Sequence, residues 1–162
     1  VDNEWDYVED VFSADSRSSK YYQVEEDFKV DLNDDGITGF AYTNLEKKGE
    51  DSLLVDQLGF YNVKDENDEM DDIRLRGKKI RQGGYPWGRA LEIVAAETID
   101  GDNQVLVKNN RTNHIYGWKV DNEWDYVEDV LSAGADSKPF FQAEKDFQID
   151  LNGDNFYGDP VI

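Results

Sequence analysis

The sequence predicts a mainly β fold of antiparallel strands, a β-rich α+β unit with a short helix before each of two acidic loops. Three observations lead to this prediction. From residue 42 onward, short apolar runs alternate with turn residues, a pattern typical of β-rich units. One long segment occurs twice, as in repeat architectures. Each copy of that segment passes through a helix-like stretch into an acidic loop.

The repeated segment spans residues 1–39 and recurs without a gap at residues 120–158, a shift of 119 (120 − 1). Identical residues occupy 23 of the 39 positions, and the string VDNEWDYVEDV opens both copies. We therefore expect a tandem-repeat unit of about 119 residues. Residues 1–41 would be the C-terminal third of one unit, and residues 42–162 one nearly complete tryptophan-rich unit. The chain is then a window from a tandem array, or a protomer whose ends meet its neighbours.

Both copies of the repeated segment predict the same local elements. Residues 1–11 alternate aromatic or apolar side chains with acids, which predicts a strand. Ser18 or Ser19 can then cap a short helix. Helical spacing gives each copy one apolar face, made of Tyr21, Val24 and Phe28 in the first copy and of Phe140, Ala143 and Phe147 in the second. Pro139 stands where a first helical turn accepts proline.

Residues 42–130 predict a series of short strands. Two apolar runs, 53–55 and 60–63, flank a turn and predict a hairpin. The run 64–72 is so charged that we expect an exposed loop. Further along the chain we expect a strand pair around Gly77, a loop with large aromatics at 83–88, turns at 100–103 and 109–113, and strands at 105–107, 115–120 and 124–130. The segment 90–99 fits the helical and strand periods equally poorly.

Charge and composition limit the function classes. The formal net charge is −20, which repels nucleic acid and anionic lipid and favours divalent cations. We expect no nucleic-acid partner, and no membrane insertion because no apolar run approaches the length of a bilayer span. The chain has no cysteine and therefore no disulfide, so we expect a metal ion or packing between repeats to stabilise it.

The acidic loops at 31–39 and 150–158 suggest calcium sites. Each follows the spacing D-x-N-x-D of an EF-hand-type loop, in which oxygens two residues apart converge on a hard cation. Position 6 holds Gly36 or Asn155, residues that tolerate the left-handed turn required there. The predicted ligands are Asp31, Asn33, Asp35 and the carbonyl of Ile37 in the first loop, and Asp150, Asn152, Asp154 and the carbonyl of Phe156 in the second.

One position departs from the EF-hand pattern. The bidentate acid expected at position 12 is replaced by Tyr42 in the first loop and by Val161 in the second. The remaining ligands would be water or nearby acids, namely Glu25, Asp27, Glu144, Asp146 or Asp159. The alternative is an acidic turn in which the Asp and Asn side chains cap their own backbone. The acids within 65–72 form either another cation site or, as we favour, a solvated run.

Other side chains leave two alternatives open. Tyr85 and Trp87 lie in a Gly-rich loop and form the candidate carbohydrate-binding pair, whereas core or inter-repeat packing is the favoured role of the four tryptophans. We expect no enzyme, because the single His114 has no cysteine or obvious serine partner. A glycosidase-like carboxylate pair stays open among so many acids, although none is singled out.

Beyond these patterns, most of the unit resembles a known family. The strings that carry the resemblance are YTNLEKKGEDSLLVDQLGFYNV, YPWGRALEIVAAETIDGDNQVLVKN, YGWKVDNEWDYV and DLNGDN, and the most specific is residues 95–109. They resemble the tryptophan-rich C-terminal domain of cyanobacterial secreted and surface proteins, often repeated and often beside calcium-binding modules. Val107 departs from it, because the family tends to have tryptophan there.

The resemblance implies an extracellular or cell-surface location and no enzymatic activity. Together with the loops, it leads us to expect a calcium-stabilised structural or adhesive repeat, which assembles head to tail with copies of itself or with adjacent repeats into a filament or array. The alternative is a carbohydrate-binding module that recognises a surface polysaccharide.

Overall fold

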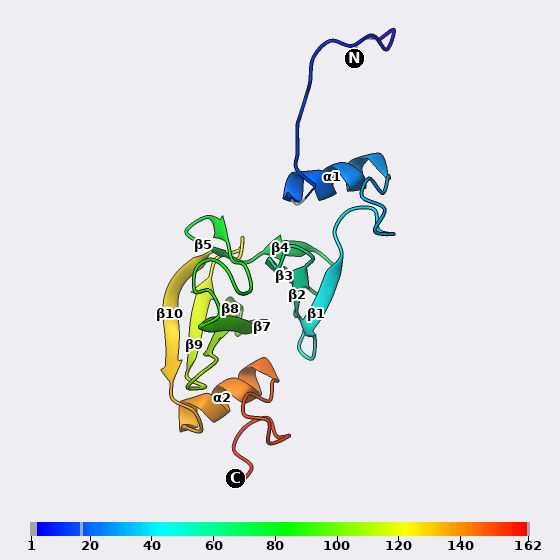
Figure 1. Cartoon of the computed structure of the whole chain (residues 1–162). Helices are drawn as coiled ribbons and strands as arrows, with labels where there is room; N and C mark the ends of the chain where they lie inside the picture. The colour runs from blue at the N-terminus through cyan, green and yellow to red at the C-terminus, as the bar shows by residue number, and fades with distance from the viewer. Residues whose placement is uncertain (1–2, 17, 162) are drawn as a thin grey trace. The chain divides into compact units, whose positions relative to one another are not determined.

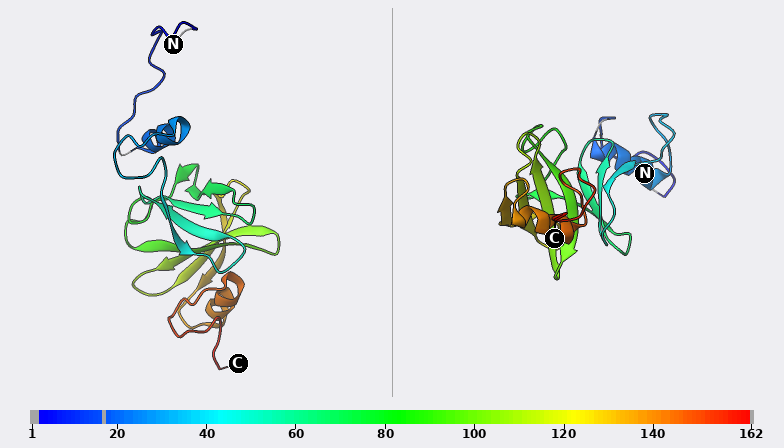
Figure 2. Two further views of the ribbon diagram at one scale, coloured as in Figure 1. Left: turned by 90° about the vertical axis from the view of Figure 1, so that its right-hand side faces the viewer. Right: turned by 90° about the horizontal axis from the view of Figure 1, so that it is seen from below.

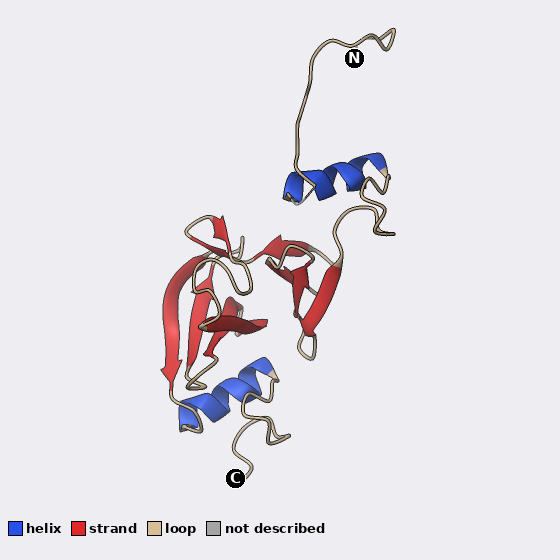
Figure 3. Cartoon of the chain, viewed as in Figure 1, coloured by secondary structure: helices blue, strands red, loops and turns tan. Residues whose placement is uncertain are grey.

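The computed structural model describes residues 3–16 and 18–161 and contains two compact units, 1–41 and 42–162 (Figure 1). Within the described residues the fold is mainly β, with three antiparallel sheets and two helices (Figure 3). The predicted fold class is therefore confirmed. No helix in the described part of the chain is long and apolar enough to cross a membrane.

The first unit contains one helix, α1 (Ser19–Phe28). Ser18 is its N-cap, and the Ser18 hydroxyl accepts a hydrogen bond from the backbone N–H of Tyr21 at 3.3 Å. Lys29, at φ 55°, ends the helix in the left-handed conformation. The acidic loop follows directly. This confirms the predicted helix and its cap.

The strand predicted at residues 1–11 is not present among the described residues 3–11, which have no regular secondary structure. Tyr7 is 73% exposed and Val11 is 81% exposed. A strand needs a neighbouring strand to satisfy its backbone groups. Residues 1 and 2 lie outside the described part.

The second unit begins with one four-stranded sheet and a short hairpin. The sheet has the order β1-β2-β3-β4, with strands β1 (Tyr42–Glu46), β2 (Ser52–Asp56), β3 (Tyr61–Lys64) and β4 (Met70–Asp72). The β2–β3 hairpin is the predicted one. Residues 70–72, predicted as part of a loop, instead form β4 and pair with β3. Their charged side chains remain at the surface while their backbone groups make the hydrogen bonds between the strands. The hairpin around Gly77 joins β5 (Arg74–Leu75) and β6 (Lys78–Lys79).

The other four-stranded sheet has the order β10-β9-β8-β7. Its strands are β7 (Leu91–Ile99), β8 (Asp102–Asn109), β9 (Ile115–Val120) and β10 (Tyr126–Ala133). The ambiguous segment 90–99 is thus a strand. Burial on both faces explains its poor periodicity, because Ile93 packs in one core and Ala95 in another.

The two faces of this sheet build two cores. Ile93, Val107 and Trp118 face the core shared with the first sheet, where Leu53 and Ile80 are fully buried. The opposite face packs against α2 (Lys138–Phe147), which Figure 1 and the views in Figure 2 place beside the sheet. The helix face predicted for the second copy is confirmed, since Phe140, Ala143 and Phe147 on α2 are all buried against the sheet. The face predicted for the first copy is not buried in the same way, because Phe28 is 69% exposed and the buried residues of α1 are Tyr22 and Glu25.

Candidate functional site

The repeated segment adopts the same local structure in both copies. Trp5 and Trp124 each stand in a turn with positive φ, at 66° and 58°. Such a conformation is uncommon for a bulky residue, so its occurrence at both positions indicates that the identical sequence encodes the turn. Ser18 and Ser137 cap the two helices in the same way, and Lys29 and Gln148 end them.

The two copies of the repeated segment differ in how far their side chains are buried. Trp124 is 5% exposed, and its backbone carbonyl accepts a hydrogen bond from the N–H of Arg74 at 3.0 Å. Trp5 is 83% exposed. After the turn, the second copy forms β10, which pairs with β9, whereas the first copy forms no strand. The local elements therefore do not depend on packing, but the strand does.

A buried glutamate organises each acidic loop. Glu144 Oε1 accepts a hydrogen bond from the N–H of Leu151 at 2.9 Å, and Oε2 accepts one from Gly158 at 3.0 Å. Glu25 does the same with Leu32 and Gly39, at 2.9 and 3.1 Å. Both glutamates are fully buried. All four carboxylate oxygens thus hold the loop backbone, a role that sequence reasoning missed when it named these residues among the alternatives for the remaining calcium ligands.

The predicted ligands of the first loop converge on its own backbone. Asp31 accepts hydrogen bonds from the N–H groups of Asp35 and Gly36, at 3.2 and 2.8 Å. Asn33 accepts one from Asp35, and Asp35 accepts one from Ile37. Gly36 has the predicted left-handed conformation, at φ 86°. The alternative of self-capping side chains therefore describes these hydrogen bonds.

The second loop repeats this pattern with small changes. Asp150 accepts from Gly153, Asp154 and Asn155, and the side chain of Asp154 accepts from the N–H of Phe156 at 2.8 Å. Asn155 takes the position of Gly36 at φ 70°. Desolvation raises the pKa of Asp150, but hydrogen bonds from backbone N–H groups outweigh it and hold the pKa below its ordinary value. The loop therefore favours an ionised Asp150.

The fit of these loops to calcium is incomplete. Each supplies two carboxylates, one amide oxygen and a carbonyl, which are ligands of the type that calcium prefers. The bidentate acid is absent, and Glu25 and Glu144 are occupied by backbone N–H groups. Within residues 3–16 and 18–161, no group of three or more Asp, Glu or His side chains is arranged to hold a metal ion. Any bound cation would need water or a rearranged acid to complete its shell.

A second acidic cluster lies where β7 meets the β1–β2 turn, and sequence reasoning missed it because its members are far apart in the chain. Glu97 Oε1 accepts hydrogen bonds from the N–H groups of Glu50 and Asp51, both at 3.0 Å. Among the described residues, Glu97 Oε2 and Glu46 Oε2 are buried without a partner. Burial raises the pKa of both glutamates, and the charge of Asp51 raises that of Glu97 further.

Tyr85 and Trp87 do not form a flat, exposed pair. The ammonium of Lys78 covers the Tyr85 ring, 4.1 Å from its centroid, and the Tyr85 hydroxyl donates to the carbonyl of Leu75. Trp87 is half-buried, and the centroid of its ring lies 5.2 Å from that of Trp118. Its indole ring is thus packed beside another tryptophan.

One family model matches this sequence. The tryptophan-rich Synechocystis species C-terminal domain matches residues 51–158, which include strands β2 to β10, α2 and the second copy of the repeated segment. No curated protein and no solved structure matches the chain.

Proposed function

Since the chain belongs to the family of the tryptophan-rich Synechocystis species C-terminal domain, we propose that it is a structural repeat of a secreted or cell-surface protein. Successive units of about 119 residues stand in tandem, and the repeated 39-residue segment completes each unit. The observation that carries the proposal is that identical turns bury Trp124 at 5% exposure and leave Trp5 at 83%. Residues 1–41 are then the last third of an upstream unit.

The exposed side chains of the first copy correspond to the core of the second. Phe28 is 69% exposed, whereas the equivalent Phe147 is 2% exposed. Leu32 is likewise exposed, and its counterpart Leu151 is buried. The first copy has exposed apolar residues at these positions. A second sheet equivalent to β7–β9 would bury them.

Burial of these residues supplies the driving force for association. A buried aromatic side chain removes roughly 150–250 Å² from water, at about 25 cal/mol per Å². Trp5 and Phe28 together would thus contribute several kcal/mol. Strand pairing along residues 7–14 would add backbone hydrogen bonds, as it does between β10 and β9.

The partner that fits best is an upstream unit of the same polypeptide. In a separate copy of this chain, β10 already pairs with β9, and α2 already covers the sheet. A linked segment has an effective concentration in the millimolar range, so it outcompetes an identical segment from another molecule. This reasoning favours covalent tandem repeats over a filament of separate chains.

Calcium is the ligand that we propose for the two acidic loops. The support is the duplicated D-x-N-x-D spacing and the net charge of −20, which a divalent cation would partly neutralise. The predicted side-chain ligands are the two aspartates and the asparagine of each loop. Their role is structural, to lock a loop that already folds on Glu25 or Glu144.

Amide hydrogen exchange tests the tandem arrangement. In an extended chain, a second copy of residues 42–119 precedes Val1 and supplies the upstream sheet. In the extended chain, we expect the amides of residues 7–14 to exchange as slowly as those of residues 126–133. Fast exchange at 7–14 in the extended chain, with 126–133 still protected, would show that the first copy does not complete a unit.

A further inference from the structure

An aromatic pocket opens at the edge of the inter-sheet core of the second unit. Its volume is about 300 Å³. Four aromatic side chains and two charged ones dominate its lining, namely Trp87, Tyr116, Trp118, Tyr126, Arg76 and Asp129. We name this site the aromatic pocket.

The sheet and one loop bring the aromatic rings together. Tyr116 and Trp118 lie two residues apart on β9, so they share one face of the sheet. The Trp118 ring lies 4.8 Å from Tyr126 on β10, centroid to centroid, and 5.2 Å from Trp87 in the loop after β6. Trp118 is buried and forms the floor, whereas the other three rings are half-buried.

The charged side chains stand at the mouth of the aromatic pocket. Arg76 and Asp129 are both exposed. In the described part of the chain, neither side chain makes a hydrogen bond or an ion pair within the protein. A guanidinium and a carboxylate are therefore both available to a ligand.

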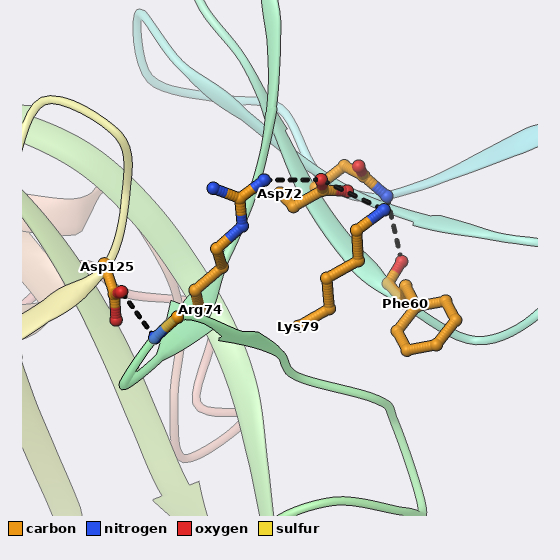
Figure 4. Close-up of polar contacts among 7 residues, drawn as sticks. Phe60, Asp72, Arg74, Lys79 and Asp125 are labelled. Carbon is orange, nitrogen blue, oxygen red and sulfur yellow. Dashed lines mark hydrogen bonds and ion pairs between the residues drawn. The ribbon is translucent and has the colours of Figure 1, made fainter. Parts of the chain in front are cut away.

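The turn that carries Arg76 is held in place from two sides. Asp72 forms ion pairs with Arg74 at 3.3 Å and with Lys79 at 3.1 Å, one on each strand of the β5–β6 hairpin (Figure 4). Asp125 accepts a hydrogen bond from the N–H of Gly77 at 2.6 Å. These contacts preorganise the rim of the pocket, which lowers the entropy that binding must overcome.

We propose that the aromatic pocket binds a single sugar ring, the terminal or branching residue of a surface polysaccharide. The apolar C–H face of a pyranose can lie against the electron-rich faces of Trp87 and Tyr126. Its hydroxyls would accept from Arg76 and donate to Asp129. The volume is at the small end of ligand sites, which suits one ring and excludes a long segment of chain.

The opposite charges of Arg76 and Asp129 favour a neutral polyol over charged ligands that also stack on aromatic rings. A quaternary ammonium would stack equally well on the rings, but repulsion by the Arg76 guanidinium offsets its attraction to Asp129. For an anion the two signs are reversed and offset each other in the same way, so the charge pair gives a charged ligand no net advantage. All the residues of this pocket lie in the second unit, so the inference does not depend on tandem assembly or on calcium.

A glycan array of mono- to hexasaccharides, followed by calorimetry with the methyl glycosides of the sugars that bind, tests this assignment on the intact chain. We expect millimolar affinity for at least one pyranoside, and Arg76→Ala and Asp129→Ala should each weaken it about tenfold, as for a lost charged hydrogen bond. Arg89→Ala and Glu128→Ala are matched controls, exposed and outside the lining, and should leave the affinity unchanged.

Three results would overturn the assignment. The first is no binding across the array by a chain whose melting temperature shows that it is folded. The second is sugar binding that survives both pocket substitutions. The third is binding of choline chloride that tightens in Arg76→Ala, which would identify a cation cage. Because both substituted side chains are exposed, we expect both variants to fold.

Discussion

Glu144 accepts a hydrogen bond from the backbone N–H of Gly158 at 3.0 Å and thereby closes the acidic loop on the helix that precedes it. Glu25 and Gly39 have the same relationship at 3.1 Å. Gly158 stands at φ 109°, a conformation that side-chain-bearing residues rarely adopt. The helix and its loop therefore form one module, present twice in the chain.

Glu144→Gln should destabilise the second unit. An amide offers one acceptor where the carboxylate offers two, so a buried N–H loses its partner at a cost of about 2 kcal/mol. The melting temperature in calorimetry should fall by several degrees. Glu128→Gln, on an exposed side chain, is the control and should leave the melting temperature unchanged. Equal melting of the two variants would show that the loop does not depend on Glu144.

Trp124→Ala and Trp5→Ala form a matched pair with very different expected costs. Trp124 is buried, so its truncation should lower the free energy of unfolding by about 3–5 kcal/mol. Trp5 is exposed, so its truncation should change that free energy by less than about 0.5 kcal/mol. Urea denaturation of the present chain measures both. A large loss with Trp5→Ala would mean that this side chain is packed in solution.

Glu97→Gln should stabilise the protein in a pH-dependent way. Burial raises the pKa of Glu97, so the stability that its protonated form contributes is complete at low pH and is lost as the pH rises through the raised pKa. At pH 8 the free energy of unfolding of the variant should exceed that of the wild type by about 1 kcal/mol, and near pH 4 the two should be equal. Denaturation curves across this range decide it, and a difference that is constant with pH would exclude the titration of Glu97 as its cause.

Calcium should raise the melting temperature if the loops bind it. At 100 times the dissociation constant, each site adds about 2.7 kcal/mol. Asp31→Ala and Asp35→Ala should each remove one ion in native mass spectrometry. Asp68→Ala serves as the control, because Asp68 is exposed and forms a surface ion pair with Lys64 at 3.5 Å. Identical calorimetric traces with calcium and with chelator would refute the calcium proposal.

Local signals in the sequence predicted the local elements well. Ser18 and the apolar spacing placed α1, and Gly36 marked a left-handed turn. The same reasoning failed for residues 3–11, although β10 has nearly the same sequence. A strand depends on its neighbour, and no local pattern states whether β9 or an equivalent stands beside it.

Sites built from distant residues could not be found in this way. Trp87 and Trp118 meet only because the sheet and the loop after β6 fold together. The spacing of Tyr116 and Trp118 was a usable signal, since alternate residues of a strand share a face. Glu25 and Glu144 occur at equivalent positions before equivalent glycines, which could have indicated their shared structural role.

The environment of Trp5 is the most direct measure of the central claim that residues 1–41 complete an upstream unit. Fluorine NMR of chains labelled with 5-fluorotryptophan, assigned with Trp5→Phe, reports it in the present chain and in the chain extended by residues 42–119. We predict a solvent-exposed Trp5 signal in the present chain, and a shift toward the Trp124 signal with loss of solvent access in the extended one. A Trp5 signal that stays solvent-exposed in the folded, extended chain would contradict the account.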